Sequence, residues 1–187
     1  ATHIWLHIYP DGGVARLCVY GEVQRDWSLV KPDDIVDLAA AQNGALAVQC
    51  NDMFFSHMNN LIMPGRGVHM GDGWETKRNR TPNNRDWVIV RLAHKGIIQK
   101  ALIDTCHFKG NYPDTFILEG IAIDPPVPSS AVRRIDPKAE SEALNSAQWT
   151  TIIERTKLQA DHEHPFEKEV VCKDPVTHVR LSIFPDG

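Results

Sequence analysis

A block of eleven residues occurs twice in this chain, once at each end. Residues 2–12 and 177–187 are separated by 175 positions and are identical at seven of the eleven. Both blocks alternate apolar and polar side chains and then reach Pro-Asp-Gly, which predicts a strand that ends in a turn. A repeat at this spacing indicates duplicated domains, because solenoid repeats recur every 20 to 50 residues or so.

The repeat also predicts how the chain is divided. If each unit ends as strand, turn and strand, residues 1–22 are the terminal hairpin of a preceding unit, 23–36 are a connector, and 37–187 are the next unit. That unit then has no counterpart of the strand expected at 14–20. Three arrangements fit: a piece of a longer two-unit protein, a chain numbered across a break, or a leading hairpin that completes the second unit.

Short strands separated by turn signals dominate the rest of the chain. Strands are expected at residues 2–9, 14–20, 45–50, 87–92, 97–104, 116–123, 170–173 and 177–184. The window 140–158 is the one convincing helical pattern, 53–62 is short helical or irregular, and 124–138 is an extended connection with several prolines. This pattern predicts an all-β fold, an antiparallel jelly-roll β-sandwich of the galactose-binding-domain type with one or two short helices.

Composition excludes several classes of protein. The chain is 42% hydrophobic and 24% charged, and no window approaches the apolar length of a membrane span. A net charge of −4 with scattered basic residues argues against nucleic acid as a partner. The four cysteines lie far apart, so we expect reduced, mostly buried thiols rather than a zinc knuckle or a disulfide scaffold. With no leader pattern in view, we expect an intracellular protein.

Residues 70–92 crowd charge, indole rings and glycines into one stretch. Two glycines and Pro82 interrupt any helix there, so the stretch is expected to be a loop leading into a strand. It is either a surface loop rich in ion pairs or a binding loop. Its charged and indole side chains are Asp72, Glu75, Lys77, Arg78, Arg80, Arg85, Asp86, Arg91, Trp74 and Trp87.

A second polar loop, residues 104–114, leaves the end of an apolar strand. If both loops reach the same end of a sandwich, their union fits a small, polar, anionic ligand, since arginines bind carboxylates and carboxylates accept from N–H groups. His107 or Glu75 could exchange a proton near neutral pH, although His107 could instead cap a backbone group at a strand end. The combined set is Asp72, Glu75, Asp104, Arg78, Arg80, His107 and Asn111.

Familiar catalytic motifs are absent from the sequence. There is no G-x-S-x-G elbow, H-E-x-x-H helix, P-loop or dinucleotide fingerprint. A thiolate mechanism at Cys106 beside His107 is disfavoured, because neighbours in a strand point to opposite faces. His162 and His164, two residues apart in a polar loop, are expected to be solvated rather than metal-bound.

Four segments together resemble the allantoicase family. These are DGWETKRNR at 72–80, RDWVIVRL at 85–92, DTCHFKGNYPD at 104–114, and the two blocks that end in PDG. The resemblance covers about 37–187 as one unit, with 2–22 similar to the end of another. It implies two similar jelly-roll units and hydrolysis of allantoate to ureidoglycolate and urea in purine degradation. The chain departs from the family pattern at Lys77, Asn83, Asn84, Ala93 and Cys106.

Within that resemblance, each candidate residue receives an expected role. Arg78 and Arg80 would bind the carboxylate of allantoate, and Asn111 and Asp72 the ureido groups, with Trp74 also in contact. The proton transfers are given to Glu75, Asp104 and His107. The sequence requires no cofactor, but Asp104, His107 and Glu75 are usable ligands for a divalent metal such as manganese.

Allantoate is therefore the expected partner, with self-association into a homo-oligomer and a cytoplasmic rather than peroxisomal location. Two other readings remain open. One is a non-catalytic jelly-roll module that binds a sugar, with Trp74 or Trp87 as stacking platforms. The other is an inactive family member kept as an assembly partner.

Overall fold

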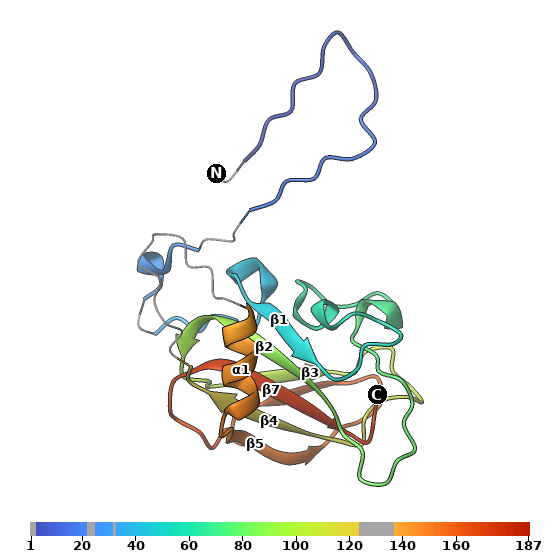
Figure 1. The fold of residues 1–187 in the computed structure, drawn as a ribbon, viewed down its shortest axis with the longest axis vertical. Helices are drawn as coiled ribbons and strands as arrows, with labels where there is room; N and C mark the ends of the chain where they lie inside the picture. The colour runs from blue at the N-terminus through green and yellow to red at the C-terminus, as the bar shows by residue number, and fades with distance from the viewer. Residues whose placement is uncertain (1–2, 22–24, 32, 124–136) are drawn as a thin grey trace.

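The computed structural model describes residues 3–21, 25–31, 33–123 and 137–187, and its strands form two antiparallel sheets (Figure 1). The larger sheet has the strand order β1-β2-β7-β4-β5. The smaller sheet pairs β3 with β6. The bounds are β1 Leu46–Cys50, β2 Asp86–Gly96, β3 Ala101–Asp104, β4 Thr115–Ile121, β5 Thr150–Lys157, β6 Glu163–Phe166 and β7 Val176–Phe184.

The second copy of the repeated block forms β7, the central strand of the larger sheet. Val179 lies opposite Val90 of β2, and Leu181 lies opposite Leu118 of β4. Residues on both faces of β7 are buried, as expected for a strand covered on two sides. The strand predicted at 177–184 is therefore confirmed, and it lies at the middle of the fold.

The two sheets enclose a single core. Phe166 of β6 packs on Phe116 of β4 with ring centroids 4.9 Å apart. β3 and β6 pair with each other in the smaller sheet, and the strands that precede and follow each of them belong to the larger sheet. The chain therefore alternates between the two layers, as in a jelly roll. The predicted all-β sandwich is confirmed.

Three predicted segments were wrong in type or extent, and one of them is the strand expected at 170–173, where the structure has only an isolated bridge between Val170 and Ile153. The helix expected over 140–158 is α1, Pro137–Ser146, and the chain then continues as β5. The β-branched run from Thr150 to Ile153 favours a strand, and Ile152 and Ile153 are both fully buried there. Strand β2 continues through the turn expected at 93–96, which shortens the next strand to four residues. Most of the connection expected at 124–138 lies outside the described residues.

The polar loop expected around His162 and His164 is partly strand β6. His162 is exposed as predicted, but His164 is buried. Its Nε2 accepts from the N–H of Gln159 at 2.9 Å, so Nδ1 carries the proton and donates to the carbonyl of Ile103 at 3.0 Å. His164 is therefore a satisfied core residue that joins β6 to β3.

The leading hairpin behaves differently from the prediction. Residues 3–21 form an extended arm that projects from the sandwich, with every side chain exposed and no strand assigned within the arm (Figure 1). Trp5 stacks on His7 at 4.8 Å, but the arm meets no core. A two-stranded hairpin without a packing partner is marginal in water, which accounts for the difference.

Two expectations from composition can be compared with the structure. All four cysteines are free thiols, as predicted, but only Cys172 is buried, while Cys18 is exposed and Cys50 and Cys106 are half-buried. Among the described residues, no helix has the length and apolar character needed to cross a membrane.

Candidate functional site

The two polar loops meet, as the sequence predicts. The side-chain amide of Asn111 donates from Nδ2 to Oε1 of Glu75 over 2.7 Å. Nearby, the ring of Phe108 packs so closely on Gly73 that a Cβ at that position would lie 2.8 Å from a ring carbon. Only glycine allows this approach, so the packing fixes the first loop against the second.

The loop that holds Glu75 is anchored by the Pro-Asp-Gly turn after β7. The N–H of Thr76 donates to the carbonyl of Gly187 at 2.7 Å, and the N–H of Asn79 donates to Oδ2 of Asp186 at 2.6 Å. The side-chain amide of Asn84 donates to the carbonyl of Pro185 at 2.7 Å. The repeated block therefore supplies the central strand and also the support for the candidate site.

Trp74 belongs to the core rather than to an open surface. Its side chain is 7% exposed and its Nε1 donates to the carbonyl of Asp52 at 2.9 Å. With both the ring and its N–H occupied, Trp74 has no free face on which a sugar could stack. The stacking role expected for Trp74 in a sugar-binding module therefore finds no support in this geometry.

Asp72 is held as an ionised carboxylate. It accepts from the N–H of Val68 at 2.8 Å and from that of His69 at 3.3 Å. The hydrogen bond from Val68 lowers its pKa most, and the nearby imidazoles of His69 and His107 lower it further. An ionised Asp72 can still accept from a ligand, since a carboxylate has about four lone-pair sites.

Asp104 is paired with an arginine that the sequence did not indicate. Nε of Arg66 lies 3.0 Å from Oδ2 of Asp104 and 3.4 Å from Glu163. Oδ1 of Asp104 also accepts from the N–H of Cys106 at 2.9 Å. Glu75 instead accepts from Asn111, so the two predicted acids have different partners.

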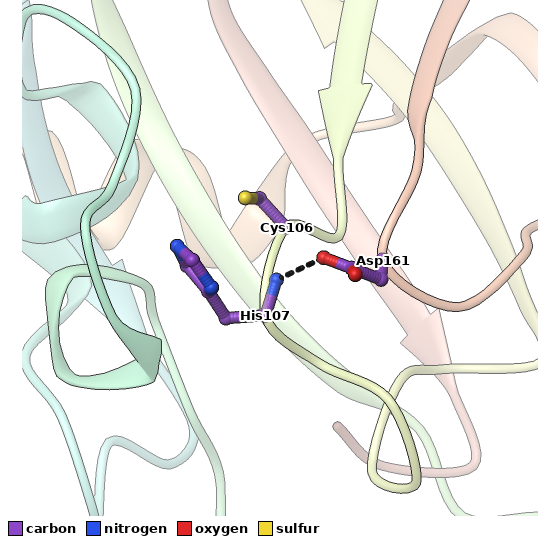
Figure 2. A group of neighbouring side chains, drawn as sticks. All are labelled: Cys106, His107 and Asp161. Atoms are coloured by element: carbon purple, nitrogen blue, oxygen red, sulfur yellow. Dashed lines mark hydrogen bonds between the residues drawn. The ribbon is translucent and has the colours of Figure 1, made fainter.

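His107 lies between two loops and has a positive φ of 70°. Its N–H donates to Oδ1 of Asp161 at 2.7 Å, and its ring donates from Nε2 to the carbonyl of Gly67 at 3.0 Å. The ring of His107 thus hydrogen-bonds to a backbone group, as the alternative to a proton-transfer role predicted. Figure 2 shows Cys106 and Asp161 beside it.

The carboxylate of Asp161 is a neighbour that sequence reasoning missed. It is separated from His107 by 54 residues, and the turn between β5 and β6 brings it to the second loop. Hydrogen bonding from the N–H of His107 is the main cause of its lowered pKa, with Lys109 and the His107 ring adding to it. Nothing in the sequence pointed to Asp161, because its one unusual local feature, a positive φ of 49°, is visible only in the structure.

Arg78 and Arg80 are the open cationic side chains of the first loop. Both are exposed, and neither guanidinium has a hydrogen bond or ion pair with any residue that the structure describes. Lys77, next to them, lies over the ring of Phe54 at 5.9 Å. The two arginines are therefore available to an anion arriving from solvent.

A wide cleft of about 1440 Å³ borders part of this region. Asp72, Asp104 and Cys106 line one part of it, and apolar side chains of the larger sheet line another. Glu75 and Asn111 are not among its lining residues. The cleft is larger than typical small-ligand pockets, which are about 300–1,000 Å³. The predicted residues therefore do not surround one closed cavity.

Comparisons with known proteins agree on one family. The family model "Allantoicase repeat" matches residues 36–187. A probable allantoicase of Pseudomonas fluorescens is 48% identical over 186 residues, and one of Pseudomonas aeruginosa is 47% identical over 189. These matches cover 100% of this chain but 53% and 52% of the relatives. The chain thus spans about half the length of the curated relatives that it matches.

A solved structure gives the same result in three dimensions. The crystal structure of allantoicase from Saccharomyces cerevisiae matches with a TM-score of 0.66 and 35% sequence identity. The match covers 84% of this chain and 42% of the yeast chain. Since a family model covers most of the chain, and sequence and fold both match known members, the chain belongs to the allantoicase family.

Proposed function

We propose that this chain is part of an enzyme that hydrolyses allantoate to ureidoglycolate and urea. The observation that carries the proposal is the contact between Glu75 and Asn111, next to two exposed arginines, in a member of the allantoicase family. The contact joins an acid to an amide at the meeting point of two loops. That pairing can serve a substrate rich in N–H groups.

The substrate's structure explains why these side chains suit it. Allantoate has one carboxylate and two ureido groups on a single carbon. Arg78 and Arg80 would bind the carboxylate with charge-assisted hydrogen bonds, while Asn111 and Asp72 would accept from ureido N–H groups. Glu75 is half-buried and would donate the proton that helps urea to leave.

Asp104 and His107 are given supporting roles in this proposal. Arg66 neutralises Asp104, and the ring of His107 already donates to Gly67. Both side chains therefore support the second loop better than they serve as proton carriers. Their contacts keep the loop that carries Asn111 beside Glu75.

We further propose that residues 1–22 are the terminal hairpin of a preceding repeat, with 23–36 as a connector and 37–187 as one repeat. Residues 2–12 match the block that forms β7 and its turn, and the side chains of residues 3–12 are all exposed in this chain, whereas those of β7 are mostly buried. Homo-oligomer formation and a cytoplasmic location stay predictions from the sequence.

Urea release from allantoate tests the proposal directly. The assay would compare this chain with a protein carrying both repeats, each with and without added manganese. Glu75→Gln should reduce release by roughly 10²- to 10⁴-fold, the range for loss of a general acid. The matched control is Glu154→Gln, on an exposed position of β5. Full activity in Glu75→Gln, or no activity in the well-folded two-repeat protein, would contradict the proposal.

A further inference from the structure

Cys106, His107 and Asp161 form a mixed cluster of metal-binding side chains (Figure 2). One ligand atom from each, a thiol sulfur, an imidazole nitrogen and a carboxylate oxygen, lies within 4.8 Å of the others. Two come from the loop after β3 and the third from the turn before β6. In the described part of the chain, no other group of three such side chains comes this close.

Main-chain contacts hold the two loops of this cluster together. The N–H of His107 donates to Oδ1 of Asp161 at 2.7 Å, and the N–H of Asp161 donates to the carbonyl of Phe108 at 3.1 Å. His107 and Asp161 both have positive φ values, 70° and 49°. The backbone that carries the cluster is therefore held in a defined conformation, so the side chains are brought together by the fold and not by flexible chain segments.

The tautomer of His107 suits metal binding. A carbonyl oxygen only accepts, so the contact of 3.0 Å with Gly67 requires Nε2 to carry the hydrogen. In the neutral imidazole, Nδ1 then has the free lone pair that a metal needs. Histidines that bind metals commonly donate their other ring N–H to a backbone carbonyl, which fixes the ring and raises its basicity.

We propose that Cys106, His107 and Asp161 bind a divalent cation of the zinc class, through Sγ, Nδ1 and one carboxylate oxygen. Thiolate, imidazole and carboxylate together favour Zn²⁺ or Co²⁺ over Mg²⁺ or Ca²⁺. Three protein ligands leave a fourth tetrahedral position for water or another ligand. This site does not depend on the proposed hydrolysis of allantoate.

Distances and charges show what binding requires. Zinc bond lengths of about 2.0–2.3 Å place tetrahedral ligand atoms roughly 3.3–3.8 Å apart, so the side chains must converge by about 1 Å. Nζ of Lys109 lies 3.9 Å from Oδ2 of Asp161 and would be displaced. Its side chain is 77% exposed and can move into solvent. Arg66, the other nearby cation, is already paired with Asp104.

The proton balance of binding is simple. The thiol of Cys106 loses its proton to solvent as the sulfur–metal bond forms, His107 binds through the lone pair of its neutral form, and ionised Asp161 binds without losing a proton. Each bound ion therefore releases at least the thiol proton, and the measured binding enthalpy depends on the buffer.

Cobalt titration of the purified chain tests the site. We expect one Co²⁺ per chain, a near-ultraviolet thiolate-to-cobalt band, and its loss when equimolar Zn²⁺ is added. Cys106→Ser should abolish the band, and His107→Ala or Asp161→Asn should weaken binding at least tenfold. Matched controls are Cys18→Ser and Asp174→Asn, at exposed positions outside the cluster. A band that persists in Cys106→Ser, or no band in the unmodified chain, would overturn the proposal.

A second measurement needs no variant and so avoids any folding defect. Thiol alkylation followed by peptide mass spectrometry should show Zn²⁺ slowing modification of Cys106 at least tenfold, with Cys18 unchanged. Equal rates at Cys106 with and without Zn²⁺ would also overturn the proposal.

Discussion

The side-chain amide of Asn111 donates to Glu75 over 2.7 Å, and this hydrogen bond joins two loops through residues that are 36 positions apart in sequence. A carboxylate with one oxygen fixed in this way presents its other oxygen in a defined direction. The contact thus positions Glu75, the residue to which we assign proton transfer. Its value to catalysis can be measured by removing the amide alone.

Asn111→Ala should lower kcat for urea release roughly 10- to 100-fold, because a proton donor displaced by about 1 Å loses that much rate. KM should also rise, because the proposed contact of Asn111 with a ureido group is lost, but by a smaller factor than kcat falls, since the arginines still bind the carboxylate of the substrate. Steady-state kinetics of the two-repeat protein would check this. An equal effect of the exposed control Asn145→Ala would show that the loss is not specific to the site.

Arg78 and Arg80 should act on substrate binding. Replacing each with glutamine removes a charge-assisted hydrogen bond worth about 1.5–3 kcal/mol, so KM for allantoate should rise roughly 10- to 100-fold with a smaller change in kcat. Arg85→Gln is the matched control, because Arg85 is also exposed and lies in the same connection. If Arg85→Gln raises KM as much, the effect comes from the general field of the loop and the assignment fails.

A buried ion pair between α1 and the larger sheet should make stability depend on pH. Oε1 of Glu140 lies 3.0 Å from Nε2 of His178 and 3.1 Å from Arg91. Burial alone would raise the pKa of Glu140, but the hydrogen bond from His178 and the charge of Arg91 outweigh it, and the pKa is lowered from 4.5. A lowered carboxylate pKa stabilises the fold above about pH 4.5, and this contribution is lost as pH falls through the folded pKa.

Glu140→Gln should therefore cost about 3 kcal/mol of unfolding free energy at pH 7, the lower end for breaking a buried pair. The cost should shrink as pH falls below about 4.5, because the unfolded wild-type chain then takes up a proton at Glu140, and it should be lost once the pH is below the lowered folded pKa as well. Urea unfolding at several pH values would measure it. Glu142→Gln, at an exposed position of the same helix, serves as the control. A cost that stays constant down to pH 3 or so would contradict the linkage.

The sequence predicted those parts of the fold whose pattern is local. β7 was found because apolar and polar residues alternate strictly before Pro-Asp-Gly. β5 was missed because Leu144, Trp149, Ile152 and Ile153 also fit helical spacing, and only burial of two adjacent isoleucines against the sheet decides for a strand. The helical pattern therefore merged α1 with the strand that follows it.

For the site, residue types were visible but partners were not. We predicted that the two loops meet because each adjoins a strand and both can reach the same end of a sandwich. The Glu75–Asn111 contact agrees with this prediction. The pairing of Asp104 with Arg66 spans 38 residues, and that of His107 with Asp161 spans 54. Contacts at such separations depend on strand order, which the sequence pattern left open.

Close packing inside the larger sheet gives a further test. A Cβ added at Gly120 of β4 would lie 2.6 Å from Cδ1 of Ile152 and 2.8 Å from Cγ1 of Val176. Gly120→Ala should therefore destabilise the fold by about 1–3 kcal/mol through overpacking. Gly110→Ala is the matched control, since nothing lies within 4 Å of a Cβ there. Thermal unfolding should separate the two variants by several degrees, and equal midpoints would contradict the packing.

The two copies of the repeated block offer a matched pair for the last prediction. Leu6 and Leu181 occupy the same position of the block, but Leu6 is 49% exposed in the arm and Leu181 is 7% exposed in β7. Leu181→Ala should cost about 2–5 kcal/mol, because it leaves a cavity between the sheets. Leu6→Ala should cost less than about 0.5 kcal/mol, since the arm adds nothing to this core.

Chemical unfolding of both variants of this chain would measure the difference. The two leucines have similar neighbours in sequence but differ in burial, so a difference in cost reports on burial. A cost at Leu6 close to that at Leu181 would mean that the arm packs into a core. In a protein with both repeats, by contrast, Leu6→Ala should become as costly as Leu181→Ala, because residues 2–12 would then form the central strand of the preceding sandwich.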